Sequence, residues 1–430
     1  TLLVSLWEVK SGVNIFLICF SLCSFPVLAN TFCYMYTADA YFAALLLAVL
    51  YAWLMKKNML RYFIPGIVII TVVCGIYQAY WCFGMVLIFA TLFLDYVYGK
   101  DTFATFIKKI VVTGINLAIS LGVYYGIARI VQLAYGLEFS SYQDMDRLGK
   151  FGSIKEIYWY ARETYHQFIE FFLVDGGFLS DWRLVGLNII IMGILIICLA
   201  VSFYRKKRAW YEQIVFWVLT ISIPLIINGL SVISRNRLWP VMMIAFVVPY
   251  LLAVVCCDRN SFFNCGGIRI LCCISVVAIA WMNYLTTNRI YVRMELAYEA
   301  TFSYLTKMTM RLEECPGYDH DTPVAFINES DIENGNELNQ VRIFAEDFPA
   351  EMSVFDDLNS MRDVDTRTMI RNELDIVDFC QAFLGFKLEI LPNEERICLY
   401  DNKEVQEMPV YPQKGSILKI DGQIVVKLPG

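Results

Sequence analysis

The sequence is short of charge: only 18% of its 430 residues are Asp, Glu, Lys or Arg, against about 25% in soluble proteins. Hydrophobic residues instead make up 58% of the chain and aromatic residues 15%. This balance excludes a disordered chain and an ordinary soluble enzyme. It predicts a polytopic membrane protein, in which each spanning helix offers about 20 mostly apolar residues to the bilayer.

Histidine and the motifs of soluble enzymes are also scarce. The two histidines, His166 and His320, lie far apart in the sequence, so a metal site built on histidine is not expected. The GxSxG, P-loop, HExxH and GxGxxG motifs are absent. Charges within the apolar runs are few and lie near the ends of the runs. This argues against an ion-coupled transporter, which needs an ionisable group near the middle of the membrane.

Apolar runs of membrane-spanning length fill the first two thirds of the chain. After a partial helix at residues 1–7 we predict nine spans, at residues 13–29, 36–55, 62–80, 82–98, 110–132, 184–204, 213–233, 238–257 and 267–285. Lysines and arginines gather in the short loops after residues 55, 98 and 204. The positive-inside rule assigns these loops to the cytoplasm. The regions predicted outside are then 30–39, 76–81, 136–183, 234–237 and 286–430.

The charge is divided unevenly along the chain. Residues 286–430 hold 27 of the 41 acidic residues and 14 of the 35 basic ones, a net charge of −13, which leaves +7 for residues 1–285. We therefore predict two domains: a mainly α, polytopic transmembrane bundle over 1–285 and a small extracytoplasmic α+β domain over 286–430. The negative sign of the second domain argues against nucleic acid as a partner.

Local patterns predict further elements in these domains. Apolar residues at helical spacing over 153–172, within the outer loop 136–183, predict an amphipathic helix that lies either on the bilayer surface or against other protein. In the second domain we predict a helix that runs to about residue 312. Strands are expected at 324–327, 387–391, 397–400 and 417–428, the last folded into a hairpin at Asp421-Gly422.

Two of the predicted outer regions carry polar and aromatic clusters before or between spans. Tyr36 and Asp39 lie at the outer start of the second span, where the carboxylate would act as a base or orient a sugar hydroxyl; the alternative is a helix cap. Tyr77, Gln78 and Tyr80 form a tip between two apolar runs that suits a sugar or a lipid headgroup. The alternative for this tip is the aromatic belt common at membrane interfaces.

The other two outer regions carry charges. Asp175, Asp181 and Arg183 lie just before the span at 184–204 and offer carboxylates and a cation, or else form a turn into that span. Arg235 and Arg237 are cations on the predicted outer side, against the positive-inside trend. Because guanidinium groups match phosphate geometry, they suit a lipid-linked phosphate; the alternative is contact with phospholipid headgroups.

Two short strings carry a resemblance to a known family. Residues 36–41, YTADAY, followed by an Ala- and Leu-rich span, and residues 75–80, GIYQAY, resemble the bacterial type-II Gtr glucosyltransferases. These are serotype-converting enzymes that decorate O-antigen or other surface polysaccharides. The resemblance covers about residues 1–285 and does not extend to the acidic domain. It implies a GT-C-like enzyme of the cell membrane that moves a hexose from a polyprenyl-phosphate donor, such as undecaprenyl-phosphate glucose, to a glycan outside the cytoplasm.

The resemblance also implies roles and partners. Asp39, Tyr77, Gln78 and Tyr80 would line the site, and an outer carboxylate would deprotonate the acceptor. Within this sequence our candidates for that base are Asp39 and Asp175, unless the base lies upstream of residue 1. A divalent cation, Mg or Mn, would assist at the donor phosphate in some members. Enzymes that make and flip the donor would be partners, within membrane lipid. Members carry an acid pair in a first outer loop, so we expect the native protein to extend upstream of residue 1.

Two other activities remain open from the sequence. The chain could be a flippase or exporter of lipid-linked sugar, which moves its substrate without forming a glycosidic bond. It could also be a surface polysaccharide polymerase or ligase, since these enzymes share many spans and a large outer loop. The product formed in the presence of labelled donor separates the three activities.

Overall fold

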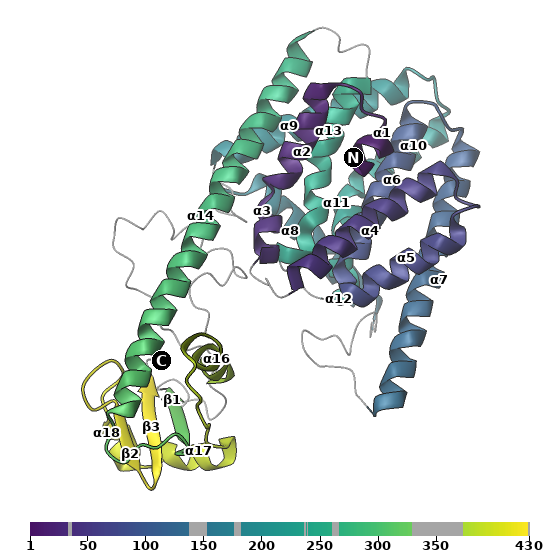
Figure 1. Cartoon of the computed structure of the whole chain (residues 1–430). Coiled ribbons are helices and arrows are strands. Elements are labelled where there is room, and N and C mark those ends of the chain that lie inside the picture. The colour runs from purple at the N-terminus through teal and green to yellow at the C-terminus, as the bar shows by residue number, and fades with distance from the viewer. Residues whose placement is uncertain are drawn as a thin grey trace. The chain divides into compact units, whose positions relative to one another are not determined.

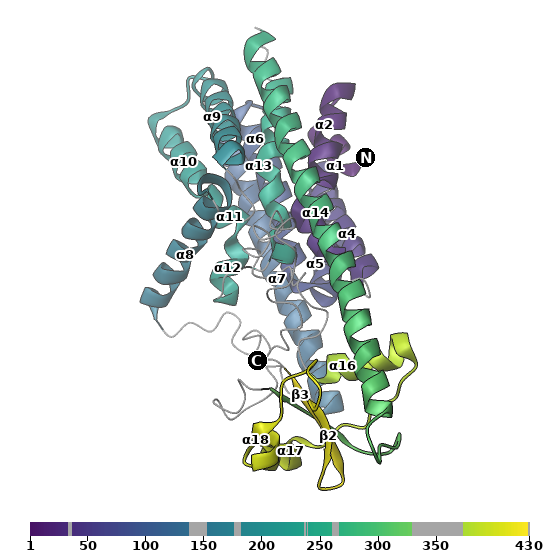
Figure 2. The same ribbon diagram turned by 90° about the vertical axis from the view of Figure 1, so that its left-hand side faces the viewer.

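The computed structural model describes residues 1–32, 37–136, 153–175, 182–235, 238, 240–259, 266–328 and 373–428. The chain forms two compact units, Thr1–Asn288 (unit 1) and Arg289–Gly430 (unit 2). Unit 1 is helical throughout its described part, and unit 2 combines helices with a small sheet. Figures 1 and 2 show these two kinds of architecture.

Unit 1 is a bundle of helices that begin and end at the following residues. They are α1 (Leu2–Trp7), α2 (Gly12–Cys23), α3 (Pro26–Thr31), α4 (Ala38–Lys57), α5 (Phe63–Ile76), η2 (Gln78–Tyr80), α6 (Trp81–Val97), α7 (Phe103–Tyr135), α8 (Ile154–Leu173), α9 (Trp182–Tyr204), α10 (Trp210–Ile221), α11 (Ile223–Ile227), α12 (Gly229–Ser234), η4 (Pro240–Val247), α13 (Val248–Arg259) and the first part of α14 (Gly266–Glu313).

Six of the described helical segments are long and apolar enough to cross a membrane. They are α4, η2 with α6, α7, α9, η4 with α13, and Gly266–Val292 of α14. The predicted polytopic, mainly helical membrane protein is thereby confirmed. Where α4 and α6 cross, Ala44, Ala48 and Ala52 of α4 are completely buried, since small side chains let helix backbones approach closely.

Three of the nine predicted spans are not single spanning helices. Residues 13–29 divide into α2 and α3, because Phe25 is extended and Pro26, which lacks an N–H, starts a new helix. Residues 62–80 hold the 14-residue helix α5, which ends where Tyr77 becomes extended, and the short helix η2, which continues into α6. Residues 213–233 divide into α10, α11 and α12, with Pro224 in the first turn of α11. Hydropathy alone does not register these backbone breaks.

The predicted amphipathic helix is present as α8, and it packs against other protein. Thr164, Gln167, Phe171 and Phe172 are buried against α9, α11 and α12. Gln167 fixes this contact, because its side-chain amide donates to the Leu238 carbonyl at 2.9 Å and its Oε1 accepts from the Asn228 amide at 2.9 Å. The first turns of α8 remain exposed. α8 is therefore an integral wall of the bundle over its second half.

Unit 2 is built on a three-stranded sheet of order β1-β3-β2. β1 (Val324–Asn328) runs parallel to β3 (Gln423–Leu428), and β2 (Ile417–Ile420) pairs antiparallel with β3. Alternate strand residues enter opposite hydrophobic clusters: Val324 and Phe326 pack with the end of α14, while Ala325 and Ile327 pack with α17 (Asn393–Tyr400) and α18 (Lys403–Glu407). The sheet is therefore covered by helices on both faces. The remaining described helices are α16 (Glu373–Phe379) and η7 (Cys380–Leu384).

The structure confirms several predictions in unit 2 and overturns two. The helix reaches Glu313, and the 417–428 hairpin turns at Asp421 and Gly422, both with positive φ, as a two-residue turn requires. The predicted strand at 397–400 is wrong, since these residues end helix α17, which starts after Pro392 with two glutamates in its first turn. Residues 387–391 form a single bridge, between Ile390 and Val324, rather than a strand.

Candidate functional site

Two of the clusters predicted from sequence meet at one end of unit 1. The Tyr41 ring of α4 lies 4.5 Å from the Tyr77 ring and 5.9 Å from the Tyr80 ring, and Tyr77 and Tyr80 are 4.8 Å apart. The turn between α5 and α6 explains the last contact, because a 3₁₀ turn places residues i and i+3 on one face. Three tyrosine rings from two segments of the chain thus form one aromatic cluster.

Asp39 lies in the first turn of α4, close in sequence to this cluster. Its side chain is exposed, and its Oδ1 accepts a hydrogen bond from the Ala40 N–H at 2.8 Å. Thr37, and not Asp39, occupies the N-cap position. The negative charge of the carboxylate therefore stabilises the N-terminus of α4 through the helix dipole. Because the side chain is exposed, a ligand can also reach it.

The polar atoms of the tip are tied to neighbouring helices. The Gln78 amide donates to the Tyr124 hydroxyl of α7 at 2.6 Å. Tyr80 is fully buried, and its hydroxyl bonds with the Thr31 side chain at the end of α3. These contacts hold α3, α7 and the α5–α6 turn together. Tyr124 and Thr31 were not among the predicted residues, because neither belongs to a polar cluster in the sequence.

Arg235 forms a second group with residues that the sequence analysis did not identify. It ends α12 with a φ of 57°, and its guanidinium lies 3.4 Å from the Glu156 carboxylate and 5.8 Å from the centre of the Tyr160 ring. Glu156 and Tyr160 are four residues apart on α8, so they share one face of that helix. The sequence spacing of Glu156 and Tyr160 predicts that they share a face, but it does not predict that Arg235 packs on that face. The site is thus a cation held by an acid and a ring.

The structure does not bring Asp175 to Arg235. Asp175 is exposed just beyond the end of α8, whereas Glu156 lies in its first turn. At 1.5 Å per residue these two ends of α8 are about 25 Å apart. Arg183, in the first turn of α9, lies 5.5 Å from the centre of the Trp182 ring. Tyr36, Asp181 and Arg237, the other predicted site residues, lie outside the described residues.

An apolar cavity of about 270 Å³ lies in unit 1, between α6, α8, α9, α10, α11 and α13. Its walls include Phe93, Phe172 and Met192, and among the described residues that line it Thr220 alone carries a hydroxyl group. The break between α10 and α11 at Ser222 and the proline after it contribute to this space. A cavity with this lining suits a hydrocarbon chain rather than a polar ligand.

The described residues do not assemble a metal site. In the described ranges no three His, Cys, Asp or Glu side chains are placed to hold one ion. Asp39, Glu156 and Asp175 come from separate places in unit 1. Each of these three carboxylates would therefore act singly, as a base or as a partner of a cation.

Comparison with known proteins adds one finding. A family model described as glucosyl transferase GtrII matches residues 1–255, which include all the predicted site residues and end within α13. No curated protein and no solved structure matches the chain. The matched part lies wholly within unit 1.

Proposed function

The chain belongs to the GtrII family of glucosyl transferases, and on this premise we propose that it moves glucose from a polyprenyl-phosphate donor to a surface glycan. The family supports a glucosyltransferase in the membrane, and the proposal adds the lipid-linked donor, the acceptor and the extracytoplasmic side. The observation that carries the donor proposal is the apolar cavity. A soluble nucleotide sugar has no hydrocarbon chain that could occupy such a cavity, whereas the tail of a polyprenyl-phosphate donor could bind in it.

The cavity and the Arg235 group share helix α8. Phe168 and Phe172 line the cavity, and Glu156 holds Arg235 near the start of the same helix. Glu156 and Phe168 are about 18 Å apart along α8, a separation that an extended polyprenyl chain spans. With its tail in the cavity, a donor would present its phosphate toward the guanidinium. Arg237 would add a second cation.

The proposed reaction is a single displacement at the anomeric carbon. A carboxylate, Asp39 in this proposal, takes the proton of the acceptor hydroxyl as the acceptor oxygen forms a bond to C1 of glucose. The bond between C1 and the phosphate oxygen breaks, and polyprenyl phosphate leaves with the electron pair. Arg235 stabilises the charge on that phosphate. The rings of Tyr41 and Tyr77 offer apolar faces against which a sugar ring can pack.

The phosphate role of Arg235 is tested by transfer of label from polyprenyl-phosphate [¹⁴C]glucose in membranes. We expect Arg235→Ala to lower the rate of transfer by about a hundredfold or more. Arg235→Lys should restore part of it, since lysine keeps the charge but not the forked geometry. Lys155→Ala, which removes an exposed cation in the first turn of α8, is the matched control. Transfer by Arg235→Ala at the control rate removes Arg235 from the site.

The tail-binding role of the cavity needs a separate test. Met192→Trp fills space in the cavity wall, and Ile189→Trp adds the same side chain on the exposed face of α9. We expect Met192→Trp to raise KM for the long-chain donor while leaving KM for a short-chain analogue nearly unchanged. Equal effects of the two variants on the long-chain donor would exclude the cavity as the tail site.

The base is assigned by comparing Asp39→Asn with Asp175→Asn. Loss of transfer in the first variant alone supports Asp39, and loss in the second alone moves the role to Asp175. The same assay decides between transfer and transport. Label that crosses the bilayer without a new glycosidic bond would identify a flippase, and elongation of a whole polymer would identify a polymerase.

A further inference from the structure

A second pocket lies at the opposite end of unit 1 from the tyrosine cluster. It has a volume of about 340 Å³ and is formed by the end of α4, the end of α6 and the first turns of α7. Tyr41 and Lys56 stand at the two ends of α4, about 22 Å apart. Four lysines line this pocket: Lys56, Lys57, Lys108 and Lys109. We refer to it as the lysine pocket.

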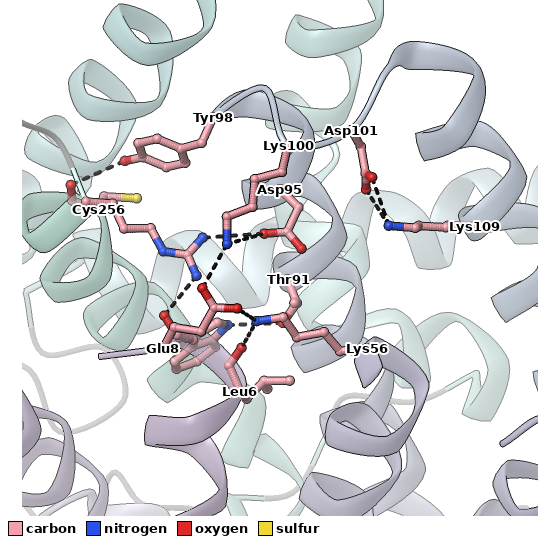
Figure 3. A network of polar contacts seen from close by, with 12 residues as sticks. Leu6, Glu8, Lys56, Thr91, Asp95, Tyr98, Lys100, Asp101, Lys109 and Cys256 are labelled. Carbon is pink, nitrogen blue, oxygen red and sulfur yellow. Dashed lines mark hydrogen bonds and ion pairs between the residues drawn. The ribbon is translucent and has the colours of Figure 1, made fainter. Parts of the chain in front are cut away.

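A network of ion pairs holds two of these lysines in place (Figure 3). The Lys56 ammonium donates to the Leu6 carbonyl and to the Glu8 carboxylate, the latter at 3.0 Å. The Lys109 ammonium donates to both oxygens of Asp101, at 2.7 and 2.9 Å. These contacts hold the Lys56 and Lys109 side chains in one position, whereas the side chain of an ordinary surface lysine moves among several rotamers.

The negative charge of Asp95, a carboxylate that lines the lysine pocket, is balanced by cations outside the pocket. Asp95 lines the pocket, but its Oδ1 lies 3.6 Å from Arg259 and 3.8 Å from Lys100, neither of which lines the pocket. Lys100 also donates to Glu8 at 2.8 Å. The acids at this end are thus shared among cations, and Asp95 leaves no net negative charge in the pocket.

Two lysines of the pocket carry charge that the protein does not neutralise. Lys57 and Lys108 are exposed, and neither forms an ion pair with a carboxylate in the part of the chain that the structure describes. The Lys57 ammonium instead lies 4.9 Å from the centre of the Trp53 ring. Two uncompensated positive charges therefore face a cavity whose other cations are fixed.

The lining of the lysine pocket is only half polar in character. Met55 and Leu92 are buried behind the lysines, and Leu60, three-quarters exposed, stands at the edge. A free anion would use the cations alone, whereas an anionic phospholipid would also use the apolar edge. Basic pockets between membrane helices are known to bind lipid headgroups.

We propose that the lysine pocket binds a phosphate group, and that its source is the headgroup of an anionic phospholipid. The site is separate from the proposed transfer site, because it lies at the other end of α4 and contains none of the residues assigned to transfer. The proposal does not depend on the identity of the sugar donor.

The test measures lipid retained by the purified full-length chain, by native mass spectrometry after exchange into mixed phosphatidylglycerol and phosphatidylcholine. The variant is Lys57→Gln with Lys108→Gln. Because each lysine near a lipid headgroup contributes a factor of about five in affinity, loss of both lysines should lower retained phosphatidylglycerol by about 25-fold. Both side chains are exposed, so the variant should fold, as far-UV circular dichroism would verify.

The matched control is Lys206→Gln with Lys207→Gln, which removes the same charge from exposed positions outside the pocket. An equal loss of lipid in this control would mean that net charge, and not the pocket, selects the lipid, and would overturn the proposal. Equal retention of the two lipids by the native chain would overturn it as well. Displacement of phosphatidylglycerol by excess inorganic phosphate would refute the lipid as the source and assign free phosphate. Retention that survives this phosphate supports the headgroup.

Discussion

Gly84 offers the sharpest test of how the two central helices pack. A Cβ atom at this position of α6 would lie 3.0 Å from the Ala48 carbonyl oxygen of α4 and 3.4 Å from the Ala48 Cα. Carbon–oxygen contacts of this kind are usually about 3.3 Å or longer. Gly84→Ala therefore requires the two backbones to separate by a few tenths of an ångström.

The magnitude follows from two opposing terms. Overpacking of a tight contact costs about 1–3 kcal/mol, and alanine is favoured over glycine in a helix by about 1 kcal/mol. We expect Gly84→Ala to destabilise unit 1 by about 1 kcal/mol. Gly84→Val should cost about 3 kcal/mol, since its two further methyl groups also meet α4 while its propensity gain is smaller.

Gly122 of α7 supplies the matched control. Nothing lies within 4 Å of a Cβ built there, so Gly122→Ala retains only the propensity gain and should stabilise by about 0.5–1 kcal/mol. The assay is reversible unfolding in mixed micelles, followed by far-UV circular dichroism with increasing fractions of denaturing detergent. If Gly84→Ala proves as stable as Gly122→Ala, the close contact between α4 and α6 is refuted.

Three further predictions concern other parts of the chain. A hydrogen bond from Lys100 lowers the pKa of Glu8 from 4.5 to about 2, so this carboxylate stabilises the fold above pH 4.5 and ceases to do so as the pH falls toward 2. Glu8→Gln should flatten that part of the stability–pH curve, by less than about 1 kcal/mol because the side chain is half exposed; an unchanged slope would contradict the ion pair. Glu373→Ala should destabilise unit 2 by about 3 kcal/mol, since Arg396 is 3% exposed and would lose its carboxylate partner. Limited proteolysis measures this loss, and equal rates of cleavage in the native and variant chains would contradict a stabilising role for the ion pair. Gly422→Ala, at a φ of 88°, should cost about 1 kcal/mol in thermal unfolding of the full chain, whereas no shift would mean that the hairpin turn relaxes.

Several elements follow directly from chemistry that is local in the chain. Long apolar runs predicted the membrane helices, and the Asp421-Gly422 pair predicted its hairpin, because both depend on residues that are neighbours in the sequence. Local chemistry also misled where two signals competed. Residues 397–400 look like a strand by residue type, but the proline and glutamates just before them start a helix.

The sites depended on contacts that no local pattern encodes. The YTADAY and GIYQAY strings are far apart in the sequence, and the contact between Tyr41 and Tyr77 exists only because α4 and α5 are antiparallel neighbours. Glu156 and Arg235 are far apart in sequence and meet only where α8 packs on α12.

The sequence by itself therefore determined the class of protein, since the bilayer selects apolar segments by composition and length. Only the tertiary structure decided which of these segments break and which side chains meet. A proline interrupts the predicted span at 13–29, and another proline interrupts the one at 213–233. The cavity beside the second break is lined by residues from six helices. Such a space arises from the packing of distant segments, which composition does not specify.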